Sequence, residues 1–119
     1  MSNELIKKSP NLVLREVIGN YVIGTIKNRI ENRNYPGVFS ALIEVEETNG
    51  STVLWDAEEK VEKEVEIEVG DTVFLRETRW LTRFMTENIG NRVRIEYTGK
   101  KKAKVKGRKD AYTYSTEVL

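Results

Sequence analysis

NRVRIEYTGKKKAKVKGRKDAYTYSTEV, residues 91–118, is the stretch that decides the fold, because it joins two strand-like segments through the most basic part of the chain. In the first segment Val93 and Ile95 alternate with charged residues, which is the period-two pattern of a strand with one buried face. The second segment repeats this alternation from Tyr112 and Tyr114 onward and is rich in aromatic and β-branched residues. The stretch therefore predicts a β-hairpin.

The loop of this hairpin is strongly cationic and contains no carboxylate up to its last lysine. Its cations are Lys100, Lys101, Lys102, Lys104, Lys106, Arg108 and Lys109. Together with the tyrosines on both arms, they offer cations for phosphates and aromatic faces for bases, the contacts that single-stranded nucleic acid uses. A charged hairpin tip that only aids solubility is the alternative.

Length and composition limit the class of protein. A chain of 119 residues is expected to form one domain, residues 1–119, with a core large enough to need no disulfide or metal. There is no Cys and no His, so the usual metal ligands and the usual base near neutral pH are missing. No apolar run approaches the length of a membrane span. We therefore expect a cytoplasmic protein that is not an enzyme, needs no cofactor or metal and has no membrane partner.

The N-terminal part, residues 1–18, is expected to be a loosely docked segment. Ser9 followed by Pro10 is a helix-start pattern and Gly19 a possible stop, which favours a short helical turn between them. The apolar residues in this range also suit an irregular lead-in to a strand.

Three strands follow in the first half of the chain. The first is expected over residues 21–31, where the interior Gly24 marks a bulge or a sharp bend. The second covers residues 38–47 and the third residues 51–55. Between them Asn49-Gly50 is the strongest hairpin signal in the sequence.

An acidic insertion, residues 56–70, separates these strands from the next. It has seven acids and two lysines between Asp56 and Glu68 and is expected to form an added β-ribbon that returns into a strand over residues 71–77. An amphipathic helix then begins after Thr78 and ends at Gly90.

This order of elements predicts a mainly β protein with one helix. Three strands, a ribbon, a helix and two strands are the parts of an OB-fold, a five-stranded Greek-key barrel with its helix between strands three and four. The loops that flank the binding face of that fold join strands one and two and strands four and five. In this chain they are residues 32–37 and the cationic loop.

Three motifs also resemble a known family. They are GNYVIGTIKNRI (19–30), GDTVFLRETRWL (70–81) and IGNRVRIEYTGKKKAKVKGRKDAYTYSTEV (89–118). They are similar to those of the small bacteriophage OB-fold proteins that bind single-stranded DNA. The resemblance implies that nucleic acid lies across the face of strands two and three, gripped by the basic loop, during phage DNA replication or recombination in the host cytoplasm. The chain departs from bacterial single-stranded DNA-binding proteins in ending at STEVL, without an acidic tail.

Several further residues are candidates for the same interface. Tyr35 and Phe39 flank the first loop, and Trp55 ends the third expected strand, so each is a candidate for base stacking, with burial in the core as the alternative. Arg92 and Arg94 lie on the face opposite Val93 and are candidates for phosphate contacts or for simple solvation.

The sequence therefore predicts a protein that binds single-stranded DNA without strong sequence preference. A second interpretation is a structural or adaptor OB module, such as a virion component or a partner of a replication or recombination protein, that docks through its acidic ribbon. A third is RNA binding, which the same fold permits. A homo-oligomer is compatible with each of the three.

Overall fold

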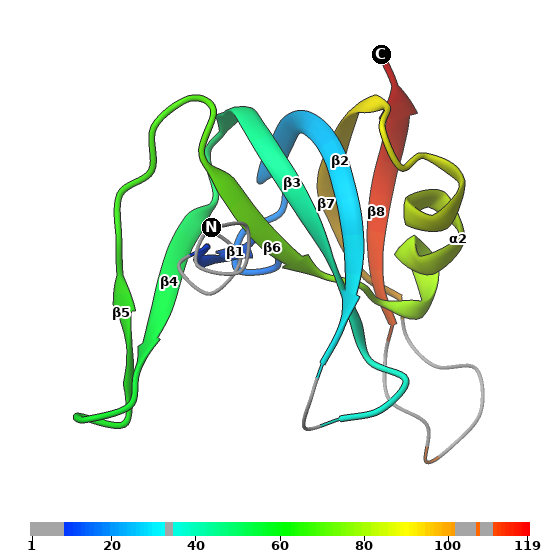
Figure 1. The fold of residues 1–119 in the computed structure, drawn as a ribbon. Helices are drawn as coiled ribbons and strands as arrows, with labels where there is room; N and C mark the ends of the chain where they lie inside the picture. Colours follow the sequence, from blue (N-terminus) through cyan, green and yellow to red (C-terminus); the bar gives the residue numbers. More distant parts are fainter. Residues whose placement is uncertain (1–8, 33–34, 102–106, 108–110) are drawn as a thin grey trace.

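The computed structural model describes residues 9–32, 35–101, 107 and 111–119. These parts form a single eight-stranded sheet and one helix (Figure 1). The strands are β1 (Asn11–Val13), β2 (Tyr21–Glu31), β3 (Phe39–Thr48), β4 (Ser51–Asp56), β5 (Val61–Glu64), β6 (Thr72–Arg76), β7 (Arg92–Lys101) and β8 (Ala111–Val118), and the helix is α2 (Arg79–Glu87).

The sheet is open, with the order β5-β4-β1-β6-β3-β2-β7-β8. The predicted class, mainly β with one helix, is confirmed for the described residues. The described strands do not form the expected closed barrel of five strands. The sheet has eight strands, and its outer strands β5 and β8 do not pair with each other.

The longest strand, β2, has an irregularity at Gly24, where a bulge or a sharp bend was expected. The pairing of β2 with β3 shifts register between Ile23 and Gly24. A Cβ atom at Gly24 would lie 2.3 Å from the carbonyl oxygen of Glu44. Only glycine allows this close approach of the two strands.

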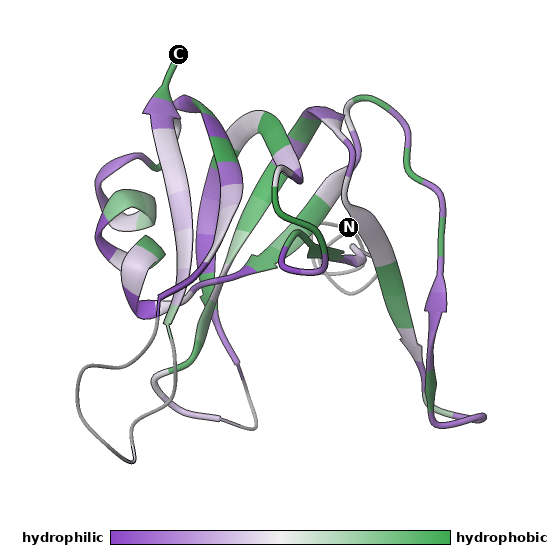
Figure 2. Ribbon diagram, turned by 180° about the vertical axis from the view of Figure 1, so that it is seen from behind, coloured by the Kyte–Doolittle hydropathy of each residue, from purple (hydrophilic) through white to green (hydrophobic). Residues whose placement is uncertain are grey.

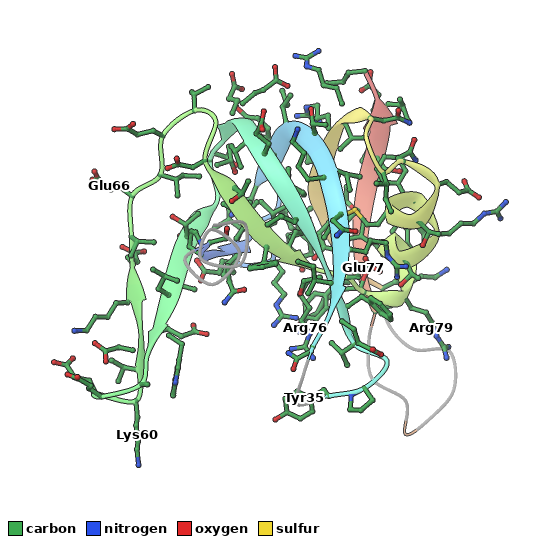
Figure 3. All side chains as sticks on the ribbon, in the orientation of Figure 1. Tyr35, Lys60, Glu66, Arg76, Glu77 and Arg79 are labelled. Atoms are coloured by element: carbon green, nitrogen blue, oxygen red, sulfur yellow. The ribbon has the colours of Figure 1, made fainter. Side chains whose placement is uncertain are left out.

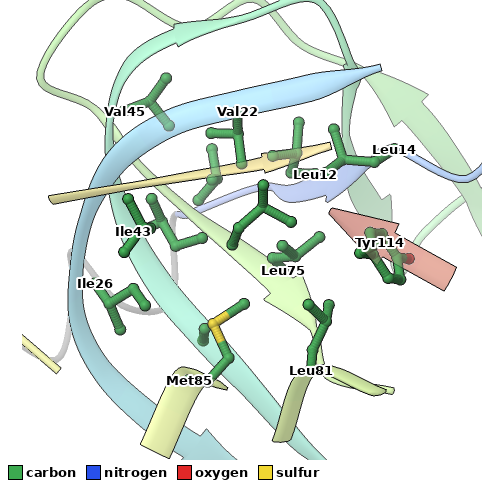
Figure 4. Close-up of a cluster of buried hydrophobic side chains, with 14 of the residues drawn as sticks. Leu12, Leu14, Val22, Ile26, Ile43, Val45, Leu75, Leu81, Met85 and Tyr114 are labelled. Atoms are coloured by element: carbon green, nitrogen blue, oxygen red, sulfur yellow. The ribbon is translucent and has the colours of Figure 1, made fainter. Parts of the chain in front are cut away.

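The N-terminal segment is a strand, so the predicted helical turn is wrong. β1 pairs antiparallel with β4 and parallel with β6. Leu12 and Leu14 are 4% and 1% exposed and belong to the core (Figure 4). Their burial outweighs the local helix-start signal. The segment is packed on the core through Ser9, Pro10, Leu12 and Leu14, whereas residues 15–18 are exposed. Residues 1–8 lie outside the described part.

The hairpin predicted at Asn49-Gly50 is also absent, because β4 pairs with β1 and β5 and not with β3. A Cβ atom at Gly50 would lie 2.8 Å from Leu14 Cδ2 and 2.9 Å from the carbonyl oxygen of Val13. Gly50 therefore lets β1 pass close to the turn. As a result β6, rather than β4, pairs with the second long strand β3.

The acidic segment forms a hairpin with β4. β5 pairs antiparallel with β4. Residues 65–68 that follow it have no regular secondary structure, although the Val65 N–H still donates to the carbonyl oxygen of Thr52 at 2.9 Å. This β4–β5 hairpin, called the acidic ribbon below, forms one end of the sheet order and lies at the left of Figure 1. Figure 2 shows hydrophilic colour on β5 and on the tip of the ribbon.

Helix α2 closes one end of the core. Leu81 and Met85 are buried beneath the strands (Figure 4). The Trp80 Nε1–H donates a hydrogen bond to the carbonyl oxygen of Tyr114 in β8, at 2.8 Å. This bond fastens the helix to the last strand of the sheet and covers part of an edge that would otherwise be open.

Candidate nucleic-acid interface

A groove of about 570 Å³ lies between the sheet and the loop that joins β2 to β3. Strands β1 and β6 supply much of its surface, and β4, β5 and β8 each contribute side chains. Its lining includes the charged and aromatic residues Arg15, Tyr35, Glu62, Phe74, Arg76 and Tyr112. Figure 3 shows Arg76 above Tyr35 at the lower end of the molecule.

The three aromatic candidates differ in what they offer. Tyr35 is 63% exposed and lines the groove. Trp55 is 60% exposed, so it is not a core residue. Phe39 is half-buried, and the guanidinium of Arg29 lies 4.4 Å from its ring centroid, which covers one face of the ring. Tyr35 and Trp55 therefore have free aromatic surface, while Phe39 has less.

Trp55 lies on the groove side of the acidic ribbon. It pairs with Glu62 across the β4–β5 ladder, and directly paired residues in a sheet point to the same face. Since Glu62 lines the groove, Trp55 faces the same side.

A tyrosine cluster forms the inner end of the groove. Tyr97 and Tyr114 are buried, with ring centroids 5.6 Å apart, and burial raises the pKa of the Tyr114 hydroxyl. Tyr112 is half-buried and lines the groove. The Arg15 guanidinium and the Lys100 ammonium lie 4.8 Å and 5.2 Å from its ring centroid. Two cations therefore meet one tyrosine at the base of the cationic loop.

The structure does not bring Arg92 and Arg94 to the groove. Arg92 pairs with Glu46 at 2.6 Å and Arg94 with Glu96 at 2.7 Å, on the β2–β7 part of the surface. Both are near the start of β7, whereas Lys101 ends it, roughly 30 Å from Arg92 and roughly 23 Å from Arg94 at about 3.3 Å per residue. Their charges are neutralised locally, and they lie at the far end of the strand from the cationic loop.

The cations without a carboxylate within 4.0 Å are distributed differently. In the described ranges they are Arg15, Lys60, Arg76, Arg79, Lys100 and Lys101. Lys60 is at the tip of the acidic ribbon. The other members line the groove or lie at the end of the molecule where α2 begins and β7 ends (Figures 1 and 3). We call Arg15, Arg76, Arg79, Lys100 and Lys101 the cationic rim.

Sequence reasoning found only part of this rim. It identified Lys100 and Lys101, but it missed Arg15 and Arg79 as contact residues. For Arg76 the strand alternation carried a signal, because Leu75 beside it is buried and Arg76 points to the opposite face. The other predicted cations of the loop, Lys102, Lys104, Lys106, Arg108 and Lys109, lie outside the described residues.

A buried ion pair keeps Glu77 from neutralising the rim. Arg29 donates to both carboxylate oxygens of Glu77, at 2.6 Å and 2.8 Å, and their side chains are 17% and 2% exposed. The hydrogen bond to Glu77 is the main reason that the pKa of Arg29 is raised. The neighbouring Arg76 remains unpaired, although Glu77 also lines the groove.

Within the described residues, no group of three or more acidic, His or Cys side chains is placed to hold a metal ion. No helix in those same ranges is long and apolar enough to cross a membrane. No protein-family model, no curated protein and no solved structure matches this chain.

Proposed function

We propose that this protein binds single-stranded DNA in the groove and along the cationic rim, without strong sequence preference. One observation carries the proposal. Apart from Lys60, the unpaired cations of the described residues either line the groove, as Arg15 and Arg76 do, or lie at the end of the molecule where α2 begins and β7 ends. Lys27, Arg92 and Arg94 elsewhere on the sheet each have a carboxylate partner.

The chemistry of this surface suits a flexible strand with exposed bases. Unpaired cations attract phosphates at no cost of breaking an existing ion pair, and the aromatic faces of Tyr35, Trp55 and Tyr112 accept bases of any kind. No acid-rich cluster or deep cavity is needed for this kind of contact. The protein acts in this proposal by binding alone, without catalysis or a cofactor.

We further propose that five of the strands form an OB-type core. The run β6-β3-β2-β7-β8 is antiparallel at every step, and the helix follows the third of these strands in chain order. Five strands with a helix after the third are the parts of that fold. β6 and β8 run in the same direction in this arrangement, and β1 occupies the edge of β6, in parallel, where β8 would otherwise close a barrel.

The motif resemblance supports the proposal that this activity serves bacteriophage DNA replication or recombination in the host cytoplasm, with a replication or recombination protein as a further partner. The adaptor interpretation predicts docking through the acidic ribbon and no affinity for nucleic acid. The RNA interpretation predicts that an oligo-U strand binds better than oligo-dT.

The test is a fluorescence anisotropy titration with labelled oligo-dT, oligo-U and duplex DNA at about 50 and about 200 mM salt. We expect oligo-dT to bind more tightly than the duplex and its affinity to fall as salt rises. No binding of any strand at the lower salt concentration would contradict the proposal and favour the adaptor. Preference for oligo-U would favour RNA.

A further inference from the structure

Most carboxylates of the acidic segment form no ion pair within the described part of the chain. Lys63 pairs with Asp56 at 3.0 Å and with Glu59 at 2.9 Å, and these are the ion pairs that the ribbon forms among the described residues. The remaining acids of the segment have no cation within 4.0 Å there: Glu58, Glu62, Glu64, Glu66 and Glu68.

The ribbon also presents apolar surface and a free strand edge. Trp55 and Val61 are 60% and 45% exposed, although each lies in a paired strand. Tryptophan is among the residues that most often anchor protein interfaces. β5 pairs with β4 on one side, and the sheet order leaves its other edge without a neighbour. Glu62 and Glu64 on this edge oppose pairing with another β5 and favour a basic partner.

The cationic rim has the opposite charge, but among the described residues the ribbon and the rim of one molecule form no ion pair with each other. β5 and β8 are the outermost strands at the two ends of the sheet order. The ribbon and the described ends of β7 and β8 are on different sides of the molecule in Figure 1. Even Glu62, which lines the groove, has no cation of the rim within 4.0 Å.

We propose that the acidic ribbon of one copy docks on the cationic rim of a second copy. The contact joins two different surfaces, so it is heterologous and can continue from copy to copy. If the rim also binds DNA, as proposed above, then DNA and the ribbon compete for the same cations. The free protein associates through its ribbons, and single-stranded DNA releases the copies from one another.

The charges involved are exposed, so each pair adds little and is screened by salt. The association is therefore weak at physiological ionic strength and grows as the salt concentration falls.

Sedimentation velocity over a range of protein and salt concentrations tests this contact. Two charge-reversal variants are compared with the natural sequence: Glu62→Lys with Glu64→Lys in the ribbon, and Arg76→Glu with Arg79→Glu in the rim. We expect each variant to associate less than the natural protein, and an equimolar mixture of the two to associate more than either variant alone, because the introduced lysines of one ribbon then meet the introduced glutamates of the other rim. The matched control, Arg92→Glu with Arg94→Glu, reverses cations outside the rim and keeps the association.

Circular dichroism establishes that each variant is folded before the comparison. The inference is overturned if the natural protein stays monomeric at low salt, if it associates equally well after either reversal, or if the mixture of folded variants stays monomeric. Addition of short oligo-dT is expected to dissolve the association of the natural protein.

Failure of this inference and failure of the proposed function give different results. A ribbon variant that is monomeric like the natural protein and binds oligo-dT normally would overturn only the self-association. Association that depends on ribbon and rim, in a protein that binds no nucleic acid, would overturn only the proposed function.

Discussion

Removal of two rim cations should change how DNA affinity depends on salt by a predictable amount. On single strands each neutralised phosphate contributes about −0.7 to the slope of log affinity against log salt, so the five described rim cations contribute roughly −3.5. Arg76→Ala with Arg79→Ala leaves three of them and lowers the magnitude of the slope by about 1.4. Between about 50 and 200 mM salt, the rim then accounts for an affinity loss of about 20-fold instead of about 100-fold.

The assay is an anisotropy titration with labelled oligo-dT at several salt concentrations within that range. Arg92→Ala with Arg94→Ala is the matched control, because Glu46 and Glu96 already neutralise these arginines. The control is expected to keep the natural slope, and urea unfolding shows that both variants keep their stability, since exposed charges add little to it. Equal slopes for the rim variant and the natural protein, or an equal reduction in the control, would refute the assignment of the rim.

Three further predictions concern the ribbon and the N-terminal strand. Trp55→Phe should abolish most of the quenching of tryptophan fluorescence by oligo-dT, whereas Trp80→Phe should retain it, because the Trp80 indole is hydrogen-bonded to β8. The opposite result would contradict the groove assignment. Leu14→Ala should lower the free energy of unfolding in urea by about 2–5 kcal/mol, as for other buried leucines, and a loss below about 1 kcal/mol would mean that β1 is loosely docked. Hydrogen bonds to Asp56, chiefly from the backbone N–H of Glu59 and next from the Lys63 ammonium, hold the pKa of the Asp56 carboxyl below its ordinary 3.8. The ionised carboxylate therefore stabilises the turn at the ribbon tip above about pH 4, and this stabilisation is lost as the pH falls through the lowered pKa. The Glu59 amide shift should report that midpoint in an NMR titration, and a midpoint at or above 3.8 would disprove it.

Elements with a strong local pattern were predictable. The expected bounds of the first long strand, residues 21–31, are those of β2, and its pairing with β3 shifts register at Gly24. The helix after Thr78 and the two arms of the basic hairpin are also confirmed. In each case the segment's own apolar residues show the strand alternation or the helical period, so the element can be predicted without knowing its distant partners.

Strand pairing depended on distant residues. Asn49-Gly50 carries the residue types of a tight hairpin turn, yet neither residue has the positive φ that this turn requires. The edge of β4 is instead taken by β1, from a segment that reads locally as a helix start. Burial of Leu12 and Leu14 decides this pairing, and burial is a property of the assembled core.

The candidate interface divides in the same way. The cationic loop, Tyr35 and Trp55 were visible in the sequence because charge and aromatic content are local. Which arginines remain unpaired was not visible, because a salt bridge depends on the neighbour that the fold supplies, and Arg92 meets Glu46 from another strand. The sequence by itself determined the long strands, the helix and the separation of acidic from basic segments, but not strand β1. The tertiary structure decided which strands pair and which charges stay free, since both depend on contacts between residues far apart in the chain.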